Sequence, residues 1–140
     1  MRVFLDANVL FSAAKSNGAV RELLRRVRAA GHELCADAYV VAEARRNLER
    51  KAPAEAATLD ALLSNVEVAP FQLTELPPDI VHRLPEKDRP VLAAALRQRC
   101  DVLVTGDRTH FGLLYGTSVG GVGIHSPRSL ADALLGGARS

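Results

Sequence analysis

Short apolar segments alternate with longer amphipathic stretches along this chain. Segments rich in apolar residues predict strands at positions 3–5, 33–36, 66–68, 102–104 and 122–124. Helical spacing of apolar residues, bounded by turn and capping residues, predicts helices at positions 19–30, 38–50, 53–64, 88–99 and 127–135. Strands that alternate with helices of about ten residues are typical of a parallel sheet covered by helices on both faces. We therefore expect an α/β fold.

The composition fits one globular domain over residues 1–140. Hydrophobic residues make up 48% of the chain and charged residues 24%, which is enough apolar material for a sizeable core. No apolar run approaches the ~20 residues needed to cross a bilayer, and the first residues do not read as a signal peptide. We therefore expect a cytoplasmic protein with no membrane partner, in which Cys35 and Cys100 are free core thiols.

Two of the most apolar strands lead directly to an aspartate. Asp6 follows the strand at 3–5, and Asp107 follows the strand at 102–104 after a Thr-Gly turn. A parallel sheet brings the carboxyl ends of its strands to one edge, where ligands bind in such folds. Two carboxylates gathered there repel each other unless a cation lies between them, and oxygen ligands suit ions such as Mg²⁺ or Mn²⁺. The sequence therefore predicts a divalent metal site at this edge.

Helical periodicity brings two further acids into consideration. Asp88 lies in line with the apolar stripe of the helix at 88–99, which directs it toward the sheet, although the same position also suits an N-cap. Glu43 lies at the border of the apolar stripe of the helix at 38–50, where most glutamates face solvent. Asp37 immediately precedes that helix and is best explained as its N-cap.

Three short polar side chains are expected near the same edge, namely those of Asn8, Ser12 and Thr105. Asn8 is suited to orienting Asp6 or contacting a substrate, and equally to capping a following helix. Thr105 is expected to fix the turn before Asp107 by hydrogen bonding, which would support a metal ligand from behind.

With these acids in place, the chain resembles the PIN domain family of nucleases, which includes bacterial and archaeal toxins of the VapC type. Residues 3–10 are similar to the family's first strand with its metal-binding aspartate, and residues 39–43 to its early helical glutamate. Residues 88–95 and 102–111 are similar to the segments that carry its remaining acidic positions. The resemblance runs from residue 2 to about residue 127 and implies a three-layer α/β/α sandwich with a parallel central sheet of about five strands.

The resemblance also implies an activity and partners. It implies that Asp6, Glu43, Asp88 and Asp107 are metal-binding catalytic carboxylates, which use Mg²⁺ or Mn²⁺ to hydrolyse phosphodiester bonds in single-stranded or structured RNA. It further implies the toxin of a toxin–antitoxin pair, with a cognate antitoxin and a homodimeric state. Some family members carry a further acid soon after the position of Asp107, but residues 108–112 hold no carboxylate. We therefore expect one tightly held metal, with a second that depends on the substrate phosphate.

Two other functions remain as alternatives. One is a phosphatase that uses Asp6 as its nucleophile. The haloacid dehalogenase-like pattern would place a second aspartate at position 8, where this chain has Asn8. The other is a non-catalytic PIN-like module that acts through a protein partner, against which the presence of all four acids counts.

The basic and aromatic residues say less about RNA binding. Two groups of basic side chains share helical faces: Arg21, Arg25 and Arg28, and Arg45, Arg46, Arg50 and Lys51. Each group is suited to an RNA backbone, although such runs most often form solvated faces. Aromatic residues make up 4% of the chain with no tryptophan, so base stacking is not the expected mode of binding.

Overall fold

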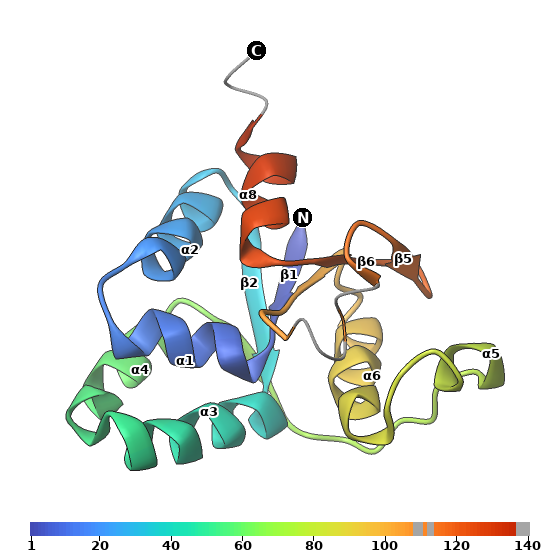
Figure 1. Ribbon diagram of the computed structural model, residues 1–140, viewed down its shortest axis with the longest axis horizontal. Helices are drawn as coiled ribbons and strands as arrows, with labels where there is room; N and C mark the ends of the chain where they lie inside the picture. Colours follow the sequence, from blue (N-terminus) through green and yellow to red (C-terminus); the bar gives the residue numbers. More distant parts are fainter. Residues whose placement is uncertain (108–110, 112–113, 137–140) are drawn as a thin grey trace.

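A six-stranded sheet forms the centre of the molecule (Figure 1). The computed structural model describes residues 1–107, 111 and 114–136. The strands are β1 (Arg2–Leu5), β2 (Glu33–Asp37), β3 (Glu67–Ala69), β4 (Val102–Val104), β5 (Ser118–Val119) and β6 (Val122–His125). They follow the order β3-β2-β1-β4-β6-β5, and every neighbouring pair is parallel except β5 with β6. The five parallel strands agree with the predicted sheet, to which β5 adds an antiparallel edge.

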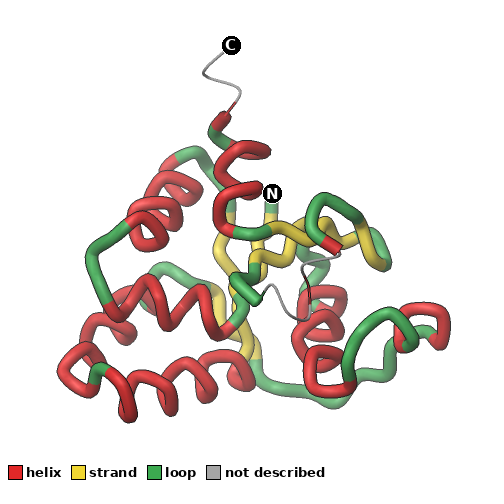
Figure 2. The backbone as a smooth tube through the Cα atoms, in the orientation of Figure 1, coloured by secondary structure: helices red, strands yellow, loops and turns green. Residues whose placement is uncertain are grey.

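Helices cover both faces of this sheet, as the coloured tube in Figure 2 also shows. The helices are α1 (Ala7–Lys15), α2 (Ala19–Ala29), α3 (Ala38–Lys51), α4 (Ala56–Leu63), α5 (Pro78–Val81), α6 (Arg89–Arg97) and α8 (Pro127–Leu134), with 3-10 turns η1 (Pro53–Glu55) and η2 (Glu86–Asp88). Helices α1 to α4 lie on one side and α5 and α6 on the other (Figure 1). The predicted three-layer α/β/α sandwich is therefore confirmed. No helix in the described part of the chain is long and apolar enough to cross a membrane.

The order in which the chain adds strands to the sheet reverses at β1, with β2 on one side and β4 on the other. From β1 the chain builds outward through β2 and β3, then returns to place β4 on the other side of β1. Both strands are buried on both faces, which explains why they are continuous apolar runs. Leu5 pairs with Val104, and the Asp6 N–H donates to the Val104 carbonyl at 3.1 Å. Asp6 therefore lies beside Thr105 at the switch point, where ligands bind in open α/β sheets.

The structure contains one long element that the sequence pattern did not predict. Helix α1 begins at Ala7, directly after β1, with Asp6 as its N-cap and no intervening loop. Its buried side chains recur with helical spacing, but no turn residue marks its start. The short elements α5 and β5 were also not predicted. Helix α6 ends before the predicted position 99, because Arg99 adopts a left-handed backbone conformation with φ of 55° that stops a helix.

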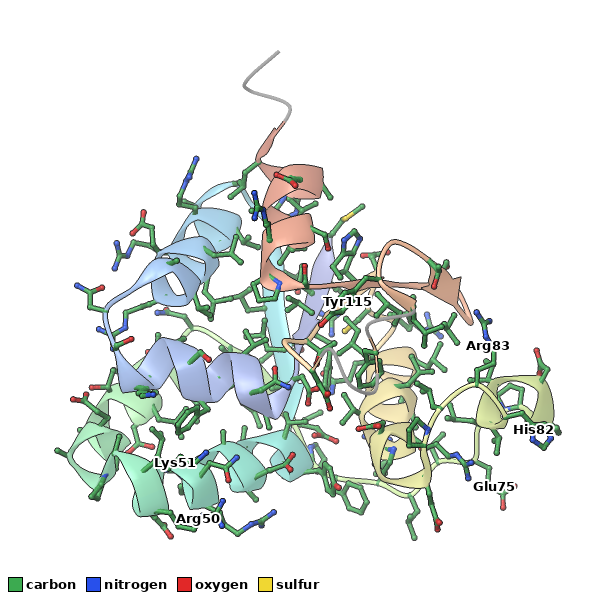
Figure 3. All side chains as sticks on the ribbon, viewed as in Figure 1. Arg50, Lys51, Glu75, His82, Arg83 and Tyr115 are labelled. Atoms are coloured by element: carbon green, nitrogen blue, oxygen red, sulfur yellow. The ribbon has the colours of Figure 1, made fainter. Side chains whose placement is uncertain are left out.

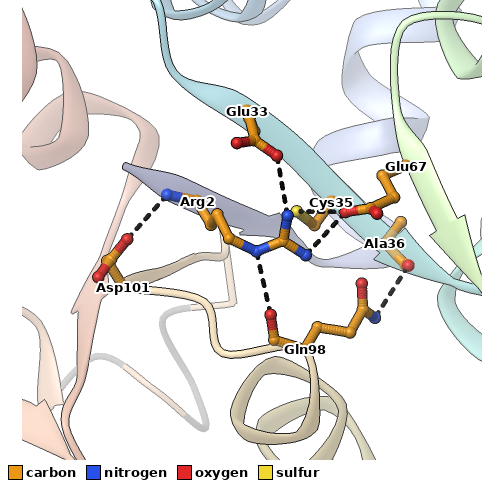
Figure 4. Close-up of polar contacts among 7 residues, drawn as sticks. All are labelled: Arg2, Glu33, Cys35, Ala36, Glu67, Gln98 and Asp101. Carbon is orange, nitrogen blue, oxygen red and sulfur yellow. Dashed lines mark hydrogen bonds and ion pairs between the residues drawn. The ribbon is translucent and has the colours of Figure 1, made fainter.

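At the amino edge of the sheet, the guanidinium of Arg2 connects neighbouring strands (Figure 4). Its Nη1 lies 2.8 Å from Glu33 Oε2 and its Nη2 lies 2.7 Å from Glu67 Oε2, so one side chain links the first residues of β1, β2 and β3. Its Nε donates to the Gln98 carbonyl at 3.0 Å, at the end of α6. The predicted free thiol Cys35 is buried nearby in β2, and Cys100 is likewise free and buried.

Candidate metal and active site

A pocket of about 150 Å³ opens at the carboxyl edge of the sheet. It is lined by Asp6, Ala7, Asn8, Tyr39, Glu43, Asn47, Asp88, Val91 and Asp107. All four predicted carboxylates are among these residues. They come from the end of β1, the body of α3, the start of α6 and the segment after β4, so the fold gathers acids from four separate parts of the sequence.

Asp6 is the most buried of the four carboxylates, with 6% of its surface exposed. Its Oδ1 accepts a hydrogen bond from the Ala7 N–H at 2.7 Å, and its Oδ2 accepts one from the Thr105 hydroxyl at 2.8 Å. Burial raises the pKa of Asp6 to about 6, with the charges of Glu43 and Asp88 adding to the rise and the two hydrogen bonds opposing it. The ionised form is therefore costly until a cation reaches the pocket.

Thr105 connects Asp6 to the turn that carries Asp107. Its hydroxyl is fully buried and donates to Asp6, while it accepts hydrogen bonds from the Asp107 N–H at 3.1 Å and the Asn8 side-chain amide at 3.3 Å. One donor and two acceptors are all that a hydroxyl offers, so its capacity is filled. The Thr105 carbonyl in turn accepts from the hydroxyl of Tyr115, labelled in Figure 3, at 2.9 Å.

Asn8 ties the same turn to the start of α1. Its Oδ1 accepts the Gly106 N–H at 2.7 Å, and its Nδ2 lies 3.5 Å from Asp6 Oδ2. Because α1 begins at Ala7 with Asp6 as its cap, the capping role that the sequence left open for Asn8 is wrong. Ser12 is exposed on α1 and does not line the pocket, so the structure does not bring it to the other predicted residues.

Glu43 reaches the pocket from the middle of α3. As predicted, Asp37 caps this helix, with Oδ1 accepting the Val40 N–H at 3.1 Å. Tyr39 and Asn47 lie one turn before and one turn after Glu43 and also line the pocket. The sequence pattern alone singles out neither residue, although their spacing of four positions from Glu43 places all three on one helical face.

Asp88 lies where η2 meets α6 and is 8% exposed. Within the described chain its side chain makes no capping hydrogen bond to α6, so the position at the helix start directs the carboxyl group into the pocket instead. Asp107 is half-buried after β4. Of the segment that lacks a further acid, residues 108–110 and 112 lie outside the described residues.

The donor set fits a hard divalent cation. Every acidic group in the pocket offers oxygen, and the raised pKa of Asp6 reflects burial beside like charges that such an ion would neutralise. Among the described residues, no three Asp, Glu, His or Cys side chains converge closely enough to hold an ion in the present arrangement. The oxygen donors and their shared place at the carboxyl edge of the sheet therefore fit a divalent cation in chemistry and position.

Several solved structures share this fold. VapBC2 from Rickettsia felis, bound to a DNA fragment from the promoter, matches with a TM-score of 0.64 and 15% identity, covering 90% of this chain and 98% of that one. VapC20 from Mycobacterium tuberculosis, a toxin that cleaves the sarcin–ricin loop, matches with a TM-score of 0.52 and 15% identity over 75% and 91% of the two chains. A toxin–antitoxin complex from Klebsiella pneumoniae matches with a TM-score of 0.56 and 18% identity over 86% and 94%.

At these identities, the solved structures establish likeness of fold. No curated protein matches the chain. A family model described as the PIN domain, however, matches residues 2–109, which is most of the sequence. The matched range includes Asp6, Glu43, Asp88 and Asp107. Together with the fold, this match confirms the resemblance seen in the sequence: the chain belongs to the PIN domain family.

Proposed function

We propose that this chain is a metal-dependent endoribonuclease and the toxin of a toxin–antitoxin pair, acting in the cytoplasm. The observation that carries the proposal is the pocket itself. Four carboxylates from separate segments line one cavity at the switch point of the sheet, and Asp6 is buried there. Concentrating acidic groups in this way is costly, and a divalent cation offsets that cost.

In this proposal Asp6, Glu43, Asp88 and Asp107 would hold Mg²⁺ or Mn²⁺. When bound, the ion activates water for attack and neutralises charge on the phosphoryl oxygens. Asp6 contributes as the ionised carboxylate, and Thr105 holds one of its oxygens by a hydrogen bond of 2.8 Å. Asn8 and Thr105 also bind the Gly106 and Asp107 N–H groups, which fixes Asp107 relative to Asp6.

The two alternatives have less support. The phosphatase pattern would place a second aspartate at position 8, where this chain has Asn8, whose side chain instead accepts the Gly106 N–H. A covalent phosphate on Asp6 would favour the phosphatase. A non-catalytic module has no need of gathered carboxylates, and weak Mn²⁺ binding in a calorimetric titration would favour it.

Structures of similar fold suggest the partners. Those from Rickettsia felis, Klebsiella pneumoniae and Haemophilus influenzae are described as VapBC or toxin–antitoxin assemblies, and we infer a cognate antitoxin here. The Mycobacterium tuberculosis toxin is described as cleaving the sarcin–ricin loop, which makes a structured RNA one substrate to test beside single strands. A homodimer is proposed on the family resemblance.

The deciding experiment is cleavage of a panel of single-stranded RNAs and a sarcin–ricin loop hairpin by the purified chain, with Mn²⁺ or with chelator. The matched variants are Asp6→Asn and Asp101→Asn, which remove one carboxylate from opposite edges of the sheet. We expect cleavage that requires metal, is lost in Asp6→Asn and persists in Asp101→Asn. Cleavage that persists in chelator or in Asp6→Asn would contradict the proposal.

A further inference from the structure

The aromatic side chains of this protein are few, but two of them gather beside the acidic pocket. Phe4 and Phe111 are fully buried in the core, whereas Phe71 is 43% exposed. Phe71 follows β3 and packs against Tyr39 with the ring centroids 5.6 Å apart and the planes inclined by 29°. This is a stacked arrangement, so Tyr39 covers one face of the Phe71 ring while the residue stays partly exposed to solvent.

Tyr39 connects this stack to the pocket. It lines the cavity together with the four carboxylates. Its pKa is raised, first by burial and then by the negative charges of Glu43, Asp6 and Asp88, while the positive charge of Arg46 opposes the rise. Tyr39 thus both lines the acidic pocket and stacks on Phe71. A continuous aromatic surface therefore begins at the acidic pocket and extends outward to the exposed ring of Phe71.

The segment that carries Phe71 is held at both ends. Before it, β3 pairs with β2 as far as Ala69. After it, Nη1 of Arg97 donates to the Gln72 carbonyl at 3.0 Å and to the Thr74 hydroxyl at 2.9 Å. The segment lies outside regular secondary structure, yet these contacts fix where the Phe71 ring stands. An exposed aromatic ring held in place is preorganised for a ligand with a flat apolar face.

We propose that Phe71, backed by Tyr39, is a stacking platform for an unpaired RNA base next to the phosphodiester at the acidic pocket. This inference rests on the proposed function and adds the way in which the substrate is bound. Single-stranded RNA is recognised largely by stacking of splayed bases on aromatic rings, and every base has a face that fits. The exposed Arg46 on α3 supplies positive charge near Tyr39 for the adjoining phosphate. The placement of these rings outweighs the low aromatic content, which alone predicted no stacking.

The test compares Phe71→Leu with Leu73→Ala in cleavage by the Mn²⁺-loaded chain. Leucine keeps an apolar side chain at position 71 but removes the ring, and Leu73 is a matched control because it is 91% exposed in the same segment. The substrate is a short single-stranded RNA that the unmodified chain cleaves. Two further RNAs have the same sequence but lack one base next to the cleaved bond. In one of them the abasic site lies on the 5′ side of that bond, and in the other on the 3′ side.

We expect Phe71→Leu to raise KM about tenfold on the intact RNA with kcat within about twofold, because stacking is a contact kept from ground state to transition state. On one of the two abasic RNAs, the variant and the unmodified chain should have equal KM values. Leu73→Ala should match the unmodified chain on every RNA. A second readout uses an RNA with 2-aminopurine in place of the base next to the cleaved bond. Binding to the cleavage-deficient Asp107→Asn chain should quench the 2-aminopurine fluorescence, and the double variant with Phe71→Leu should not quench it.

Other results would overturn the inference, and they separate its failure from that of the proposed function. Suppose that the unmodified chain cleaves RNA and that Phe71→Leu has the same KM and kcat as the unmodified chain on the intact RNA. Then no base stacks on Phe71, and the exposed ring serves a protein contact instead. Equal losses on intact and abasic RNA would likewise exclude stacking. If the unmodified, folded and Mn²⁺-loaded chain cleaves no RNA, the proposed function fails and this inference fails with it.

Discussion

The two edges of the central sheet treat their acidic residues in opposite ways. At the amino edge, Glu33 and Glu67 both pair with the guanidinium of Arg2. At the carboxyl edge, neither Asp6 nor Glu43 forms an ion pair with an arginine or lysine of the described chain, although both line one pocket with two further acids. In the first arrangement, a cation of the chain itself compensates part of the negative charge. In the proposed function, a bound divalent cation compensates the charges of the second arrangement.

Asp37 shows that position on the carboxyl edge is not sufficient. It ends β2 on the same edge and is 1% exposed, but its Oδ1 caps α3 and its Oδ2 lies 3.7 Å from Arg97 Nη2. This carboxylate already has a helix start and a cation nearby. Asp6 also caps a helix, α1, but no arginine or lysine of the described chain forms an ion pair with it, so the two buried caps differ in whether the fold supplies a nearby cation.

The largest expected effect comes from removing the negative charge of one carboxylate in the pocket. We expect Asp6→Asn and Asp107→Asn each to lower kcat for RNA cleavage by at least about a hundredfold while the chain stays folded, since asparagine keeps the shape and loses the charge. Activity is measured with Mn²⁺, and folding by circular dichroism. Full activity in both variants, or unfolding of both, would show that the carboxyl edge is not the site.

The second effect is a dependence of stability on pH in the absence of metal. The pKa of Asp6 is raised to about 6 in the folded chain, so the folded state holds this proton more tightly than the unfolded state does. The contribution of Asp6 to the free energy of unfolding is complete below about pH 4 and is lost as pH rises through about 6, by up to about 3 kcal/mol.

Urea denaturation in chelator measures this dependence, with Asp6→Asn as the control because an amide does not titrate. The unmodified chain should lose stability between pH 4 and 7 relative to Asp6→Asn. Saturating Mn²⁺ should reduce or reverse the difference, because the metal binds the ionised carboxylate. Parallel pH profiles in chelator would contradict the assignment of a raised pKa to Asp6.

A smaller effect is expected from the hydroxyl that orients two of the carboxylates. Thr105→Val keeps the branched shape but removes the hydrogen bonds to Asp6 and Asp107. We expect kcat to fall about tenfold and the Mn²⁺ concentration for half-maximal activity to rise, as is typical when a group supporting a metal ligand is lost. Thr105→Ser, which restores the hydroxyl, should recover most of the activity. Equal losses in both variants would assign Thr105 a packing role only.

The smallest effect tests the opposite edge. Arg2→Met removes the guanidinium but keeps a long apolar stem, so Glu33 and Glu67 lose their shared partner. Because the pairs are partly exposed, we expect a loss of about 1 kcal/mol in the free energy of unfolding. Activity with Mn²⁺ should be unchanged. A large change in kcat without a change in stability would mean that the two edges are not independent.

The sequence predicted the sheet, Asp6 and Asp107 from strong local signals, whereas Glu43 and Asp88 rested mainly on the family resemblance. β1 and β4 are apolar runs that end at Asp6 and near Asp107, and parallel strands share an edge. Helix α1 was not predicted because Asp6 serves two roles, so the strand meets the helix with no loop to mark the boundary. The role of Asp6 as a helix cap and the burial of its side chain became visible only in three dimensions.

Other features depend on contacts between distant segments. Tyr39 joins the pocket through its helical face, which the sequence contains, but its stack on Phe71 depends on how β3 leads into the following segment. Ser12 was expected at the pocket from its nearness in sequence to Asp6, yet the helical path of α1 leaves it exposed. The spacing of residues along one helix could be used to predict which of them share a face. The sequence held no such signal for the contact between a loop and a helix.

The segment that carries Phe71 is held by fewer hydrogen bonds than the strands and turns that carry the acidic groups. The strands and turns that carry the acidic groups are interlocked by Thr105 and Asn8, so a substitution there disturbs several bonds at once. The stretch after β3 is held by the pairing of β3, by the stack of Phe71 on Tyr39 and by the two hydrogen bonds of Arg97, so a substitution there disturbs fewer bonds. Substitutions in the segment after β3 can therefore change the surface beside the pocket while the acidic groups stay in place.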